Sequence, residues 1–147
     1  MGRLFSEFRE GEVFETRGRT ITEADIHQFA QFSGDWNPVH IDETHAAPLF
    51  GTRIAHGPMF PGIAFGMLSQ HDLIDGTAIA LHGLDWRFTA PVRIGDTIQV
   101  RAEVETCSPH PERADRGRVG FRIEVRNQND EIVNHGHATV VIQTGEN

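Results

Sequence analysis

One carboxylate and one imidazole stand five positions apart in a short segment of the chain, as Asp35 and His40. A regular helix brings together residues three or four apart, so a spacing of five does not place both side chains on one helical face. Pro38 lies between them and disfavours the α conformation at the residue before it. A bent loop can therefore bring the two side chains to one point, where an acid and an imidazole can perform general acid–base chemistry on a water molecule.

The same segment also allows a purely structural interpretation. Asp35 can end the preceding helix or form an Asx turn with Asn37, and His40 can be an ordinary surface residue. The spacing alone leaves both interpretations open.

The composition limits the classes of protein to consider. A length of 147 residues indicates a single domain over residues 1–147. The net charge of −8 argues against a general affinity for nucleic acid or an anionic membrane. The single cysteine, Cys107, excludes an internal disulfide and a cysteine-based zinc cluster. Without an apolar run of ~20 residues or a secretory signal, we expect a cytoplasmic protein.

An amphipathic helix over Glu23–Phe32 is predicted to position the acid–imidazole segment. Thr22 stands at an N-cap position with Asp25 three residues later, which is the spacing of a capping box. Gly34 is expected to end the helix, because glycine tolerates the left-handed conformation. The loop with Asp35 and His40 then follows a packed helix directly.

Two further helices are predicted before the middle of the chain. Asp42–Ala47 resembles a short helix that is capped by Asp42 and stopped by Pro48. Gly57–Gln70 is apolar on almost every side and is therefore predicted to be a buried helix. Within it, Gly62 and Gly66 are expected to clear one side for close approach by strands.

The second half of the chain has the pattern of β-structure. Alternation and β-branched residues predict four long strands, over Thr77–Ala90, Thr97–Cys107, Gly117–Asn127 and Glu131–Gln143. The predicted fold class is α+β, an antiparallel β-sheet wrapped around a long central α-helix. Pairing of sheets in a homodimer is the natural cover for the free sheet edges.

The segment Ser33-Gly34-Asp35-x-Asn37-Pro38-x-His40 resembles the hydratase motif of the MaoC-like dehydratases, the (R)-specific enoyl-CoA hydratases with a hotdog fold. The resemblance spans about residues 22–142. It includes three other segments, Ile54-Ala55-His56-Gly57, Arg87-Phe88-x-x-Pro91-Val92-x-x-Gly95-Asp96-Thr97, and Asn127-Gln128 followed by Val133. An eight-residue signature is more specific than a lone glycine pattern, and it favours the catalytic interpretation.

The resemblance implies a dimer with active sites at the subunit interface and an acyl-CoA or acyl-carrier thioester as substrate. Asp35 and His40 would activate one water for addition across the double bond of a trans-2-enoyl thioester. The backbone N–H of Gly57, at the start of the buried helix, would stabilise the thioester oxyanion. No cofactor is required for this reaction, because the thioester supplies the acidity.

Four further residues are expected to shape the substrate site. Asn37 would order the loop and bond to His40, Trp36 would form a wall of the acyl site, and His56 would shape the loop before Gly57. Two features depart from the family pattern. Pro58-Met59-Phe60-Pro61-Gly62 follows Gly57, and Phe65 places a bulky ring where some relatives have a small polar side chain, which would shorten or redirect the acyl site.

Other assignments remain open at this point. The enzyme could act on carrier-bound 3-hydroxyacyl chains, or be a hotdog thioesterase, and a non-catalytic acyl-thioester-binding subunit belongs to a different class. We predict no metal site, because the strand pair His135 and His137 lacks a third ligand. The arginines Arg118, Arg122 and Arg126 form either a solvated strand face or a landing site for CoA phosphates.

Overall fold

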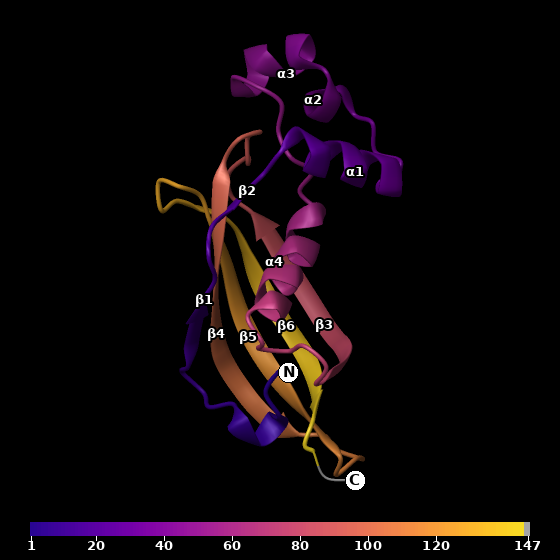
Figure 1. The fold of residues 1–147 in the computed structure, drawn as a ribbon, viewed down its shortest axis with the longest axis vertical. Helices are drawn as coiled ribbons and strands as arrows, with labels where there is room; N and C mark the ends of the chain where they lie inside the picture. The colour runs from indigo at the N-terminus through magenta and orange to yellow at the C-terminus, as the bar shows by residue number, and fades with distance from the viewer. Residues whose placement is uncertain (146–147) are drawn as a thin grey trace.

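The computed structural model describes residues 1–145, which form one antiparallel sheet wrapped around a helix (Figure 1). The strands follow the order β1-β4-β5-β6-β3, and the short β2 also pairs with β4. Their bounds are Val13–Glu15 (β1), Arg19–Thr20 (β2), Ala78–Phe88 (β3), Thr97–Pro109 (β4), Arg116–Arg126 (β5) and Ile132–Gln143 (β6). The predicted α+β class and the four long strands are therefore confirmed.

The central helix α4, Met59–Gln70, lies against the sheet in Figure 1 and carries the core. Phe60, Ala64 and Leu68 follow one another at intervals of four, are almost fully buried, and belong to one apolar cluster with the inward side chains of β4 and β5. Burial of each large side chain of this kind stabilises the fold by about 1.5–3 kcal/mol. The prediction of a buried helix is confirmed.

The expectation for the two glycines of this helix was wrong. Gly62 and Gly66 are exposed, and a β-carbon at either position would meet no atom within 4 Å. Strands therefore do not approach this side of α4. The helix buries the face defined by Phe60, Ala64 and Leu68, and the glycines fall on the opposite side.

Three helices gather beyond one end of the sheet, at the top of Figure 1. They are α1 (Glu23–Ser33), α2 (Pro38–Ile41) and α3 (Glu43–Phe50). The predicted capping box of α1 is present, and Gly34 ends the helix with a φ of 78° in the left-handed region. A 3₁₀ turn, η1 (Phe5–Glu7), precedes β1 at the other end of the molecule.

Two predictions about these helices need correction. The stretch from Asp35 to His40 is not entirely loop, because Asn37 caps the short helix α2 with Pro38 at its first position, where proline has no intrahelical bond to lose. In addition, Pro48 does not stop α3, which ends at Gly51 in the left-handed conformation. Pro48 costs the helix one hydrogen bond, and the Asp42 cap, which binds two backbone N–H groups, offsets that loss.

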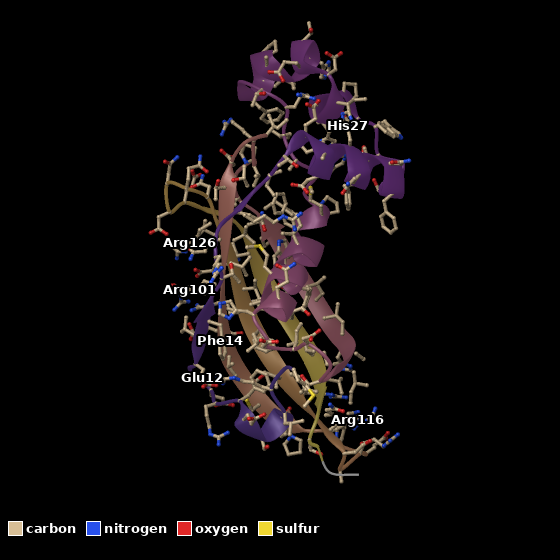
Figure 2. All side chains as sticks on the ribbon, viewed as in Figure 1. Glu12, Phe14, His27, Arg101, Arg116 and Arg126 are labelled. Atoms are coloured by element: carbon tan, nitrogen blue, oxygen red, sulfur yellow. The ribbon has the colours of Figure 1, made fainter. Side chains whose placement is uncertain are left out.

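The arginines of β5 are largely paired with acidic neighbours. Arg122 lies 2.9 Å from Glu103, and Arg126 lies 2.8 Å from Glu124. Figure 2 shows Arg126 and Arg101 on the same side of the sheet, next to β1. The ion pairs at Arg122 and Arg126 fit the solvated strand face, whereas the Nε of Arg118 is buried and has no hydrogen-bond partner among residues 1–145. No helix among residues 1–145 is long and apolar enough to cross a membrane.

Candidate active site

Two segments of the chain meet between the helical layer and the start of α4. The first, residues 33–40, leaves α1, and the second, residues 54–57, leads into α4. The second segment is held to the sheet side of the molecule, since Ala55 N–H donates to the Val92 carbonyl at 2.8 Å. Arg53, just before it, pairs with Glu23 of α1 and Glu43 of α3, so one guanidinium ties the helices to this segment.

The Asp35 carboxylate is oriented by its own loop. Asn37 N–H donates to Asp35 Oδ1 at 3.1 Å, and Asp35 N–H donates to the Ser33 hydroxyl at 3.1 Å. The Asx turn of the structural interpretation is thus present. It uses only one carboxylate oxygen, and the other, Oδ2, lies 3.8 Å from His40 Nε2. The predicted meeting of Asp35 and His40 is therefore found, and the turn is part of how it is achieved.

His40 is nearly buried, and its ring is oriented by the backbone of the second segment. Nδ1 lies 2.8 Å from the Ile54 carbonyl oxygen, which can only accept, so Nδ1 carries the proton. In the neutral ring Nε2 is then an acceptor, and it faces Asp35. A separation of 3.8 Å is too long for a direct hydrogen bond, and a water oxygen about 2.8 Å from both atoms fits the gap geometrically.

His56 lies directly against His40 and has no exposed surface. Its Nε2 lies 2.9 Å from the Asp35 carbonyl oxygen and donates to it, and its ring stacks on the His40 ring with centroids 3.7 Å apart and planes at 25°. Burial lowers the pKa of His56, and the neighbouring His40 adds to this effect against the opposing influence of Asp35. His56 is therefore a neutral side chain at neutral pH.

Gly57 presents a backbone donor beside an apolar hollow. We find no hydrogen-bond acceptor for the Gly57 N–H within residues 1–145, and this group stands at the N-terminal end of α4, where free N–H groups and the helix dipole favour a negative charge. The hollow has a volume of about 330 Å³ and is lined mainly by apolar residues, among them Phe60, Phe88 and Val92. The Phe88 ring would lie 3.1 Å from a β-carbon at Gly57, so a larger residue at this position would require the ring to shift.

The side chains of Asp35, His40 and His56 could also be considered as metal ligands, because one possible ligand atom from each lies within 4.8 Å of the others. Their geometry does not suit a metal site. A ligating imidazole points a ring nitrogen at the ion, whereas two stacked rings hold their nitrogens in nearly parallel planes. One nitrogen of each ring is bound to a backbone carbonyl, which leaves one nitrogen of each ring without a hydrogen-bond partner among residues 1–145.

Of the other residues that were expected to shape the substrate site, some lie beside Asp35 and His40 and one does not. Asn37 Oδ1 accepts from Val39 N–H at 3.4 Å, so its side chain orders the loop by capping α2, and the expected bond to His40 is made by the backbone, where His40 N–H donates to the Asn37 carbonyl at 2.9 Å. Trp36 is half exposed beside Asp35, with its ring edge towards His27, which Figure 2 labels in the helical layer. Phe65 packs against the core and does not line the hollow beside Gly57.

Two contributors to this site had no role in the sequence-based prediction. One is the Ile54 carbonyl, which no side-chain pattern can signal, because every residue has such a group. The other is Phe88, which belongs to the segment 87–97 that resembles the MaoC-like family. In the sequence, Phe88 is marked only as an aromatic residue near the end of a predicted strand, four positions before Val92, which is buried in the structure.

Comparison with protein families places most of the chain in one known group, since residues 6–126 match the MaoC like domain. A 3-hydroxybutyryl-CoA dehydratase of Methylorubrum extorquens is 35% identical over 144 residues, which cover 97% of this chain and 87% of that protein. An (R)-specific enoyl-CoA hydratase of Rhodospirillum rubrum is 33% identical, over 94% of this chain and 90% of that protein.

Solved structures agree on the architecture. The MaoC-like dehydratase of Rhodospirillum rubrum superposes with a TM-score of 0.83 at 28% identity, covering 97% of both chains. A Mycobacterium tuberculosis protein with a double hotdog fold gives a TM-score of 0.84 over 99% of this chain and 46% of that chain. At 24% identity the latter likeness shows the fold alone. The expected hotdog fold is confirmed.

The lowered pKa of His56 gives the stability of the protein a pH dependence of defined sign. An unfolded histidine titrates near pH ~6.5, so between that pH and the lower pKa of the folded state the unfolded chain binds the extra proton. The stabilisation is complete above pH ~6.5 and is lost as the pH falls from there towards the folded pKa. We expect His56→Phe to remove this pH dependence, which changes the free energy of unfolding by at most about 1.4 kcal/mol per pH unit.

Urea unfolding at about pH 7.5 and about pH 5.5 measures the effect. The wild type should lose more stability than His56→Phe over that interval. Equal losses in the two proteins would show that His56 takes up a proton equally in both states.

Proposed function

The chain belongs to the MaoC-like family, and from this premise we propose that it adds water to a trans-2-enoyl thioester, or removes it from an (R)-3-hydroxyacyl thioester, with Asp35 and His40 as the acid–base pair. The gap of 3.8 Å between Asp35 Oδ2 and His40 Nε2 is the observation that carries this assignment. It is open to one water and too wide for the two groups to satisfy each other. The relatives described as hydratases and dehydratases support the reaction class.

The two groups at the gap divide the proton chemistry. The water oxygen forms a bond to C3 of the enoyl thioester while one water proton moves to the pair, where neutral His40 offers Nε2 as acceptor. The electron pair of the double bond moves towards the thioester carbonyl, and a proton is delivered from the pair to C2. Asp35 accepts a hydrogen bond from the second water proton, which stays on the oxygen as the product hydroxyl, and Asp35 stabilises the imidazolium that forms at His40. Dehydration is the same sequence in reverse.

The negative charge that develops on the thioester oxygen is met by the Gly57 N–H. This donor has no acceptor within the described residues and stands at the start of α4, so it needs no rearrangement to bind an oxyanion. The thioester would lie with its oxygen at Gly57 and its C3 at the Asp35–His40 gap. The reaction then needs no metal or redox cofactor, because the thioester carbonyl accepts the electron pair.

The substrate carrier is proposed to be CoA. The hollow beside Gly57 has an apolar lining and a volume of about 330 Å³, which is at the small end of the range for ligand sites. A short enoyl-CoA such as crotonyl-CoA is therefore the first substrate to test. The relative that acts on 3-hydroxybutyryl-CoA supports a short chain.

We propose that the active form is a homodimer that pairs through β3. This strand ends the sheet, pairs with β6 alone among the strands of residues 1–145, and exposes Ile79, Leu81, Leu84 and Phe88 by 43–53% each. An apolar free edge of this kind is a template for pairing with a second chain. Phe88 also covers Gly57, so a second copy on β3 would lie beside the apolar hollow and help to close it.

The acid–base assignment predicts the behaviour of two variants. Asp35→Asn and His40→Ala should each lower the rate of crotonyl-CoA hydration by about 10²–10⁴-fold, because each removes a group that moves or holds a proton. The loss of the enoyl-thioester absorbance measures the rate, and a thiol reagent in parallel detects free CoA. Asp72→Asn and His45→Ala, at exposed positions, are the matched controls and should retain wild-type rates.

Hydration that survives both active-site substitutions would contradict the assignment. Release of free CoA without hydration would instead identify a thioesterase. Thermal unfolding of each variant shows whether a loss of rate reflects a loss of folded protein.

The dimer proposal predicts a change of mass in solution. The wild type should sediment at about twice the chain mass of 16.4 kDa, and Leu81→Lys on β3 should shift it towards the monomer, since a lysine at the interface must be desolvated. Val13→Lys on β1, at the opposite end of the sheet order, is the matched control. A monomeric wild type, or equal effects of the two lysines, would contradict pairing through β3.

A further inference from the structure

We propose that His56 is the positioning residue of this site, which fixes the distance between the Asp35 carboxylate and the His40 ring without exchanging a proton itself. The inference rests on the proposed function and deepens it. It starts from the observation that a buried polar side chain, with zero exposure, touches both members of the acid–base pair.

The two segments of the site are fastened to each other by a reciprocal pair of hydrogen bonds. The ring of His40, from the first segment, donates to the Ile54 carbonyl of the second at 2.8 Å. The ring of His56, from the second segment, donates to the Asp35 carbonyl of the first at 2.9 Å. Ile54 N–H also donates to the Val39 carbonyl at 3.1 Å. Asp35 and His40 are thus each held by a residue of the opposite segment.

Of the two crossing side-chain hydrogen bonds, the one from His56 holds Asp35. The backbone N–H of Asp35 is bound to Ser33, its Oδ1 to Asn37, and its carbonyl to His56. With these groups occupied, Oδ2 is the polar atom of Asp35 that remains for the gap. Loss of the His56 bond would free the peptide plane between Asp35 and Trp36 to rotate about ψ of Asp35, and the backbone that carries the carboxylate side chain would lose this restraint.

The same ring limits the motion of His40. The two imidazoles lie face to face at 3.7 Å, and Phe29 also contacts His56, with centroids 4.9 Å apart. The His40 ring therefore rests on a ring that is itself packed against α1. This contact fixes the plane of His40 and thus the direction of its Nε2.

His56 is suited to this role because one tautomer is enforced. Nε2 must carry the proton that is donated to the Asp35 carbonyl, so Nδ1 is the bare nitrogen of the neutral ring. Nδ1 is buried and meets no hydrogen-bond partner within residues 1–145. A second proton there would have no acceptor among the described residues and would place a charge beside the stacked His40 ring. The ring supplies packing and one donor, and it adds no charge beside the pair.

Three substitutions separate the donor from the ring. In His56→Gln the amide nitrogen takes the place of Nε2, so the bond to the Asp35 carbonyl is kept and the ring is lost. His56→Asn carries the same group on a shorter side chain that does not reach this carbonyl. His56→Phe keeps the ring and loses the donor. Gln and Asn are thus a matched pair that differs in reach.

We expect the bond to Asp35 to be the more important part. His56→Phe and His56→Asn should lower kcat for crotonyl-CoA by about 10²-fold with KM changed less than about twofold, because a shift of about 1 Å in a catalytic group has effects of this size. His56→Gln should recover most of kcat. A rise in KM at constant kcat, wild-type kcat in His56→Phe, or no recovery in His56→Gln would each overturn the proposal.

A second measurement does not depend on turnover. Nitrogen-15 NMR of the imidazole groups in the wild type should show His56 neutral, with Nε2 protonated and Nδ1 bare, from about pH 6 to about pH 8. A His56 ring that titrates in this range, or the opposite tautomer, would overturn the proposal even in a protein that hydrates crotonyl-CoA. Conversely, the expected spectrum in a protein without hydratase activity would locate the failure in the proposed function.

Discussion

The hydrogen bonds that cross between residues 33–40 and residues 54–57 are the constraint on which the site depends. The first segment contains the start of the short helix α2, and the second is irregular apart from one isolated bridge at Ile54. His40 reaches the Ile54 carbonyl, His56 reaches the Asp35 carbonyl, and the two rings stack between these bonds. The result is a gap of 3.8 Å between one carboxylate oxygen and one imidazole nitrogen, in which the Asp35 side chain is about half exposed and the His40 side chain is nearly buried.

The fold contributes by bringing rigid elements to both sides of that gap. On one side, α1 is closed at both ends, by the Thr22 capping box and by Gly34, so the loop leaves it in a defined direction. On the other side, α4 is anchored in the core by Phe60 and its neighbours, and Gly57, just before the N-cap of this helix, presents its N–H. Asp35 and His40 thus lie in the helical layer, and Gly57 lies beside the hotdog core and its apolar hollow. In the proposed function the thioester spans both parts.

Much of this arrangement could be predicted from the sequence, because local rules decide it. The capping box, the glycine at the end of α1, the apolar face of α4 and the alternation in β5 each require only a few neighbouring residues. The errors arose where contacts outside the local pattern decide the conformation. Pro48 is tolerated because of the Asp42 cap, the glycines of α4 face away from the sheet, and the orientation of His40 depends on a backbone carbonyl fourteen residues away. Patterns of side chains do not register such contacts.

The most direct test of the account is a crystal structure of the Asp35→Asn variant with bound crotonyl-CoA, since removal of one acid–base group should slow turnover enough to retain the substrate. The account predicts that the thioester oxygen accepts a hydrogen bond from Gly57 N–H at about 2.9 Å and that C3 faces the gap between residue 35 and His40 Nε2. A thioester whose oxygen lies away from Gly57, or whose C3 faces away from the gap, would contradict it.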